Sequence, residues 1–160
     1  MRYRNISEGR IGEISLLIGT FQFENSEVAL KGISRILLEM GFVAEDYPRA
    51  LIEREREYPT GIEVPGFVNV ALPHAHVKYT RRPVLFIGLL SEPIEFYKMD
   101  SPSEKVKVEA IILLALKDLD ESASFLRKLT SLLSNKEFAV AIRERNAVNV
   151  RSLIEKLCGS

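Results

Sequence analysis

The residues best suited to chemistry in this chain are its two histidines, which lie in the segment Ala71-Leu72-Pro73-His74-Ala75-His76. Because proline cannot donate to a sheet ladder, Pro73 predicts that a strand ends or reaches an edge at this point. The ring of His74 is then placed where it can meet solvent and a partner. If the backbone stays extended, His74 and His76 point to the same face, roughly 6–7 Å apart at their Cα atoms. Arginines lie on both sides of the segment: Arg54 and Arg56 before it, Arg81 and Arg82 after it.

Three kinds of chemistry could use this segment. A neutral imidazole nitrogen is a good nucleophile near neutral pH, so a histidine could accept a phosphoryl group whose oxygens an arginine fork would bind. A His-x-His pair could instead bind a metal, given a further ligand such as Glu63 or Glu92. Two histidines at a strand end could also make ordinary structural hydrogen bonds. The residues alone leave these three interpretations open.

The composition narrows the class of protein. The 160 residues include 22 Lys plus Arg and 22 Asp plus Glu, and the resulting net charge of zero argues against a general nucleic-acid binder. The only cysteine is Cys158, which excludes a disulfide framework, and one cysteine with two histidines cannot supply four ligands to a structural zinc site. The longest apolar runs are far shorter than the roughly 20 residues that a membrane helix needs. We therefore expect a single domain over residues 1–160, located in the cytoplasm.

The elements that must position the histidines can be predicted from the apolar pattern. Strands are indicated by short apolar or alternating runs at Ile14–Ile18, Phe67–Leu72, Val84–Leu90 and Val106–Leu116. Helices are indicated by the three- and four-residue spacing of apolar side chains after Asn25-Ser26, from about Asp46 to Glu57, and after candidate N-caps at Asp120, Asn135 and Asn149. This order predicts an α/β fold in which helices cover a small mixed sheet.

Several short motifs occur in an order that resembles a known family. Arg54-Glu55, Pro59-Thr60-Gly61 and Val70-Ala71-Leu72-Pro73-His74 resemble the Arg-Glu…Thr-Gly…Ala-Ile-Pro-His pattern of the fructose/mannitol-type (type 2) enzyme IIA domains of the bacterial sugar phosphotransferase system. The stretch Tyr-Pro-Thr-Gly-Ile-Glu is most similar to the galactitol-type branch. The resemblance covers essentially residues 10–157.

This resemblance implies a phosphotransferase component with a mixed sheet of about five strands, flanked by helices on both faces, and with no metal or organic cofactor. In that family the histidine of the Pro-His pair is phosphorylated by the histidine-containing phosphocarrier protein. It then passes the group to a cysteine of enzyme IIB, which phosphorylates the sugar at the membrane-bound enzyme IIC. His74 matches that histidine, Arg54 the arginine that contacts the phosphoryl group, and Thr60 the hydroxyl residue beside the site. Nucleic acid is not an expected partner.

The chain departs from the family pattern at one place. Many members carry a second histidine early in the helix after the last strand, where this chain has Ser122. A serine cannot hold or relay a proton as an imidazole does. Either this branch manages without that histidine, which we favour, or His76 replaces it as an auxiliary residue. The missing histidine also leaves an alternative function open, a regulatory module similar to the nitrogen-related enzyme IIA proteins that acts through phosphorylation-dependent partner binding.

Overall fold

The computed structural model describes residues 5–158, which form a mixed sheet of six strands. The strands are β1 (Ile6–Ile11), β2 (Ile14–Phe21), β3 (Gly61–Ile62), β4 (Val70–Ala71), β5 (Val84–Tyr97) and β6 (Lys105–Ala115). Their order across the sheet is β1-β2-β5-β6-β4-β3. The pairs β2/β5 and β4/β6 are parallel, and the other neighbouring pairs are antiparallel.

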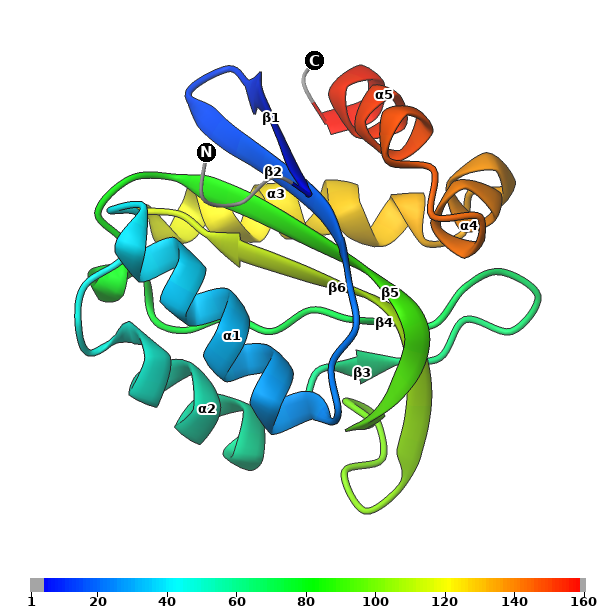
Figure 1. Ribbon diagram of the computed structural model, residues 1–160, viewed down its shortest axis with the longest axis horizontal. Coiled ribbons are helices and arrows are strands. Elements are labelled where there is room, and N and C mark those ends of the chain that lie inside the picture. The colour runs from blue at the N-terminus through cyan, green and yellow to red at the C-terminus, as the bar shows by residue number, and fades with distance from the viewer. Residues whose placement is uncertain (1–4, 159–160) are drawn as a thin grey trace.

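Helices cover both faces of this sheet, and in Figure 1 the helices α1 (Ser26–Glu39) and α2 (Tyr47–Glu57) lie in front of it. The helices of the other face are α3 (Leu119–Leu132), α4 (Lys136–Arg143) and α5 (Ala147–Cys158). Each layer of helices closes one apolar cluster against the sheet. Phe86 and Ile87, adjacent residues of β5, are fully buried in opposite clusters, as the alternation of a strand requires. The predicted α/β fold is therefore confirmed.

The central strands lie where the apolar pattern predicted them, and β5 is longer than predicted. The strand predicted at Val84–Leu90 continues as β5 to Tyr97, through Glu92 and Pro93. The register between β5 and β6 shifts between Leu89 and Ile94. Such an irregularity removes residues from the ladder locally, so a proline can be accommodated without interrupting the strand.

Outside the centre of the sheet, the sequence pattern predicted the strands less well. The strand expected at Phe67–Leu72 is reduced to the two residues of β4. The chain before β4 is instead a turn, in which the Phe67 N–H donates to the Val64 carbonyl at 3.0 Å. The edge strands β1 and β3 were not predicted, since β1 has mostly polar residues between its two terminal isoleucines and β3 is only two residues long.

The helix N-caps were predicted in part. The side chains of Asn25 and Asn135 cap α1 and α4 as expected. For α3 the cap is Asp118 and not Asp120, because the Asp118 carboxylate accepts the N–H of Glu121 at 2.8 Å. Before α5, the Asn146 side chain accepts an N–H at 3.1 Å, and the residue that donates it is Asn149, the expected cap.

The parallel pairing of β4 and β6 determines where the histidine segment lies. Because the strands run in the same direction, their carboxyl ends meet the same edge of the sheet. The chain after β4 continues into Pro73 and His74, while the chain after β6 leads through Asp118 into α3. Residues from two separate parts of the sequence therefore lie at the same edge of the sheet. The 3₁₀ helix η1 (Val77–Tyr79) follows the histidines and leads toward β5.

Candidate active site

The imidazole of His74 is half-buried and is held by the backbone just before it. Its Nδ1 lies 2.9 Å from the carbonyl oxygen of Leu72. A carbonyl oxygen can only accept a hydrogen bond, so in the neutral ring Nδ1 carries the proton and Nε2 keeps its lone pair. This contact thus assigns the tautomer and leaves Nε2 as the ring nitrogen with a free lone pair.

Thr60 is linked to the histidine segment by the sheet. Its carbonyl oxygen accepts the N–H of Leu72 at 3.2 Å, next to the antiparallel pair formed by Gly61 and Ala71. Thr60 is only 2% exposed, and its backbone N–H and its hydroxyl are both engaged as donors. The Thr60 N–H and hydroxyl each donate, at 2.8 Å, to a different carboxylate oxygen of Glu55.

Glu55 is a residue of the site that our sequence reasoning missed. It lies in the last turn of α2 and is half-buried. Burial raises the pKa of Glu55 to about 7, and the two hydrogen bonds from Thr60 lower it only in part. The available signal was the Arg54-Glu55 pair itself, of which we had assigned a role only to the arginine.

Arg54 precedes Glu55 in α2, but its side chain is exposed. Its guanidinium carbon lies 4.6 Å from the centroid of the Tyr58 ring, a cation–π contact. Among the residues that the structure describes, no hydrogen bond joins Arg54 to His74 and no carboxylate pairs with its guanidinium. The fork of Arg54 is thus available to an incoming anion.

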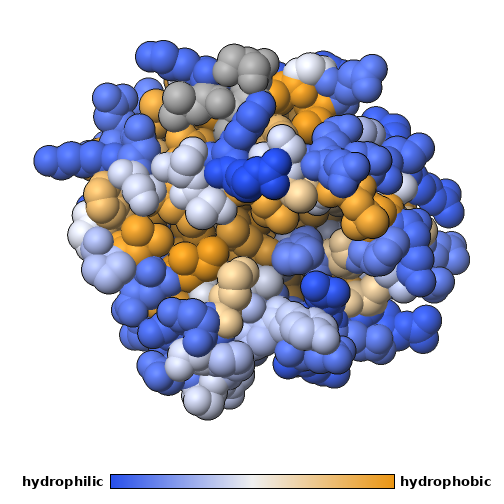
Figure 2. Space-filling model, turned by 180° about the vertical axis from the view of Figure 1, so that it is seen from behind, coloured by the Kyte–Doolittle hydropathy of each residue, from blue (hydrophilic) through white to orange (hydrophobic). Residues whose placement is uncertain are grey.

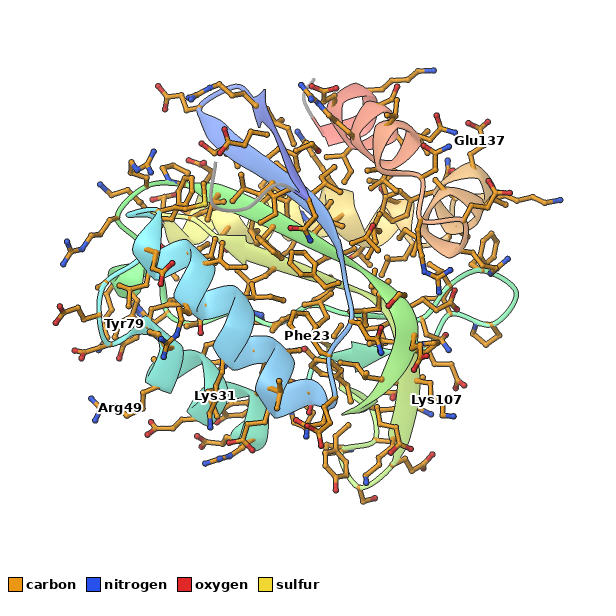
Figure 3. The ribbon with its side chains drawn as sticks, in the orientation of Figure 1. Phe23, Lys31, Arg49, Tyr79, Lys107 and Glu137 are labelled. Carbon is orange, nitrogen blue, oxygen red and sulfur yellow. The ribbon has the colours of Figure 1, made fainter. Side chains whose placement is uncertain are left out.

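His76 is exposed and has a different hydrogen bond from His74. Its Nδ1 accepts the backbone N–H of Lys78 at 3.0 Å and caps η1, which places the ring proton of neutral His76 on Nε2. Figure 3 shows Tyr79, the last residue of η1, beside the chain that connects α1 to α2, where its carbonyl accepts the N–H of Ala44 at 2.8 Å. His76 therefore anchors the segment after His74.

Ser122, the position of the family's second histidine, lies in the first turn of α3 and is half-buried. Since α3 follows β6, this turn begins at the sheet edge where the chain leaves β4 for His74. The backbone N–H of Ser122 donates to the Asp118 carbonyl at 2.9 Å. The fold thus brings the first turn of α3 to the edge that carries His74.

Within the described residues, no three His, Cys, Asp or Glu side chains gather in a way that could hold a metal ion. Glu63, one of the ligands considered for a His-x-His site, is paired with the Lys98 ammonium at 3.3 Å. No helix in the described part of the chain has both the length and the apolar character needed to cross a membrane.

An imidazole with one nitrogen fixed and the other unprotonated, at the edge of a mixed α/β sheet, is the kind of group that a histidine phosphocarrier requires. Residues 14–157 match the family described as phosphoenolpyruvate-dependent sugar phosphotransferase system, EIIA 2. The chain belongs to this family, and it is accordingly a phosphotransfer component of the sugar phosphotransferase system.

Similar proteins agree with this membership. The galactitol-specific EIIA component of the phosphotransferase system from Escherichia coli K12 is 29% identical over 106 residues, which are 66% of this chain and 69% of the relative. The crystal structure of PtxA, a IIA protein from Streptococcus mutans, has a TM-score of 0.69 at 23% identity and covers 89% of both chains. The Escherichia coli complex of mannitol enzyme IIA with phosphorylated enzyme IIB contains a chain with a TM-score of 0.66 at 18% identity, covering 88% of this chain and 92% of that one. At these identities the two structures support the fold alone.

Proposed function

We propose that this chain, as one domain over residues 1–160, is a phosphocarrier in which His74 alternates between a free and a phosphorylated state. The observation that supports this most is the contact of His74 Nδ1 with the Leu72 carbonyl, which leaves Nε2 free to act as the nucleophile. The proposed donor is the histidine-containing phosphocarrier protein, and the proposed acceptor is a cysteine of enzyme IIB. The sugar is then taken up through the membrane-bound enzyme IIC. We place the reaction in the cytoplasm, with no metal or organic cofactor.

The proposed chemistry consists of two displacements at phosphorus. In the first, the lone pair of His74 Nε2 attacks the phosphoryl group of the donor, the donor's P–N bond breaks, and the donor imidazole keeps the electron pair. In the second, a thiolate of enzyme IIB attacks phosphorus, and the electrons of the P–Nε2 bond return to His74. Both steps depend on alignment of the attacking and leaving atoms and on stabilisation of charge on the phosphoryl oxygens.

Arg54 is the residue that we propose holds the phosphoryl oxygens. Its exposed guanidinium has Tyr58 as its contact and no paired carboxylate among the described residues, so an arriving phosphoryl group would not have to displace one. Thr60 is proposed to border the pocket together with nearby backbone N–H groups. Because its hydroxyl donates to Glu55, Thr60 would contact a phosphoryl oxygen directly only by releasing that bond. We assign His76 a structural role at η1 in place of an auxiliary role in the transfer.

The partners must dock and leave in turn, and the surface offers an apolar face on which they could do so. Figure 2, which views the molecule from behind, shows a band of apolar side chains across the middle of the face on which α3 lies. Leu119, the first residue of α3, is 63% exposed, and Ile62, Val64 and Phe67 are half-buried against the core of this side. The similar mannitol protein was solved in complex with enzyme IIB. By analogy we propose enzyme IIB as a partner of this chain, and a galactitol-like sugar as the transported substrate.

Phosphorylation in a reconstituted system tests this proposal. Incubation with phosphoenolpyruvate, enzyme I and the phosphocarrier protein should add about 80 Da, a mass that acid removes as expected for phosphohistidine. His74→Ala should gain no mass, while the matched control His76→Ala should gain it as the wild type does. An unmodified wild type, or a fully modified His74→Ala, would refute the proposal. Addition of a galactitol-type enzyme IIB should then discharge the group, whereas retention of the group together with phosphorylation-dependent capture of a regulator would favour the regulatory alternative.

A further inference from the structure

The Glu55 carboxylate is hydrogen-bonded to Thr60 through both of its oxygens, unlike an ordinary surface carboxylate. Both of its oxygens are used by one residue, since Thr60 donates its N–H to one and its hydroxyl to the other, each at 2.8 Å. Glu55 belongs to α2, while Thr60 lies beyond the end of that helix, directly before β3. The pair of bonds therefore fixes the start of β3 to a helix that is itself packed on the sheet through the buried Leu51.

Thr60 is also hydrogen-bonded to the segment that leads from β4 to the histidine. Its carbonyl accepts the Leu72 N–H at 3.2 Å, which extends a β3/β4 ladder of only two residue pairs. On the other side, Gly61 is confined by the end of β5, because a Cβ added to it would lie 2.7 Å from the Tyr97 carbonyl oxygen. A ladder this short depends strongly on each of its bonds, so the fixed position of Thr60 contributes to that of Leu72, together with the pairing of β4 with β6.

Leu72 in turn holds the imidazole. Sheet pairing ends at Ala71, and no strand spans residues 72–76. The ring of His74 therefore takes its orientation from the bond of Nδ1 to the Leu72 carbonyl, and not from a ladder of its own. A continuous chain of contacts runs from the Glu55 carboxylate through Thr60 and Leu72 to His74.

We propose that Glu55 is a positioning residue for His74, which acts through Thr60 and Leu72 to keep the proton on Nδ1 and to aim Nε2 at the incoming phosphoryl group. The consequence for the reaction rests on the proposed phosphocarrier function, whereas the orientation of the ring is a property of the free protein. Loss of the carboxylate should disturb the tautomer of His74 and slow the transfer step, without removing any group that touches the phosphoryl oxygens. A residue that merely stabilised the fold would change neither the tautomer nor the rate of transfer in the folded protein.

The test combines imidazole ¹⁵N NMR with transfer kinetics on Glu55→Gln and Thr60→Val, with Thr60→Ser as the matched control that keeps both donors. In the wild type and in Thr60→Ser, His74 should be protonated on Nδ1. In the other two variants the Nδ1 signal should move toward a mixture of tautomers. His76 is an internal control, because its opposite tautomer is set by Lys78 and should not change.

With the phosphocarrier protein as donor, the two disturbed variants should lose about tenfold in kcat while KM stays within about twofold, since misplaced reactive groups affect chemistry more than docking. An unchanged His74 tautomer in a folded Glu55→Gln would overturn the proposal, as would a wild-type kcat. If Thr60→Val fails to fold, Glu55→Gln decides the question. The NMR result does not depend on phosphorylation, so a wild type that is never phosphorylated would refute the proposed function and leave the positioning of His74 to be judged by its tautomer.

Discussion

Replacement of Glu55 by glutamine should make the free energy of unfolding of the domain depend less on pH. Burial raises the pKa of Glu55 from an ordinary 4.5 to about 7 in the folded protein. The folded state therefore binds this proton more tightly than the unfolded state does. The resulting contribution to stability is fully present below pH 4.5 and is lost as the pH rises through about 7.

The size of this effect follows from the two pKa values. A tenfold difference in proton affinity corresponds to about 1.4 kcal/mol, so the difference between 4.5 and about 7 gives at most about 3.5 kcal/mol. Because Glu55 is half-buried, we discount this to roughly 2 kcal/mol. Relative to Glu55→Gln, the wild type should thus lose roughly 2 kcal/mol of unfolding free energy between pH 5 and pH 9.

Urea unfolding at several pH values between 5 and 9, followed by circular dichroism, measures this difference. Burial raises the pKa of Tyr47 further above its ordinary value of 10, which keeps that hydroxyl protonated over the whole range. If the wild type and Glu55→Gln differ by the same free energy at every pH, the assignment of a buried, proton-binding carboxylate at this position is wrong.

Three further substitutions test other parts of the account. Arg54→Ala should slow phosphoryl transfer about 10- to 100-fold, as expected for a lost charge-assisted contact, while the urea midpoint stays near that of the wild type; unchanged kinetics would remove Arg54 from the site. His76→Ala should be phosphorylated normally yet lose about 0.5–1 kcal/mol of stability with the cap of η1, and a variant that cannot be phosphorylated would show that His76 takes part in the reaction. Gly61→Ala should cost about 1–3 kcal/mol in thermal unfolding, because its Cβ would lie 2.7 Å from the Tyr97 carbonyl oxygen; wild-type stability would mean that β3 is not confined there.

The centre of the fold could be predicted from the sequence because its elements are strongly patterned. The apolar run in β5 is covered on both faces, and its residues are almost fully buried, as a continuous apolar sequence indicates. The side chains of Asn25 and Asn135 mark helix starts by a purely local hydrogen bond, which a sequence displays directly. Edge strands carry weaker signals, and the two residues of β3 have none, since only their pairing with Ala71 and Val70 of β4 makes them a strand.

The position of the proposed nucleophile after a strand could be predicted from the sequence, but the contacts around it could be predicted only in part. The Pro73-His74 pair indicates a histidine at the end of a strand, and the structure places it after β4. The contact between Glu55 and Thr60 could not be predicted, because it depends on how the chain turns after α2 and on the pairing of β3 with its neighbours. Within a single sequence, Arg54-Glu55 is equally typical of a solvated helix face. Only the three-dimensional arrangement shows that the Glu55 carboxylate is bound by Thr60, while the Arg54 guanidinium is exposed.

The central claim, that Nε2 of His74 accepts the phosphoryl group, is tested most directly by NMR of the phosphorylated protein labelled with ¹⁵N on histidine. The contact between Nδ1 and the Leu72 carbonyl predicts a single phosphohistidine, at position 74, with the ³¹P–¹⁵N coupling on Nε2 and the proton still on Nδ1. A phosphoryl group on Nδ1 of His74, on His76, or on no histidine would contradict the account.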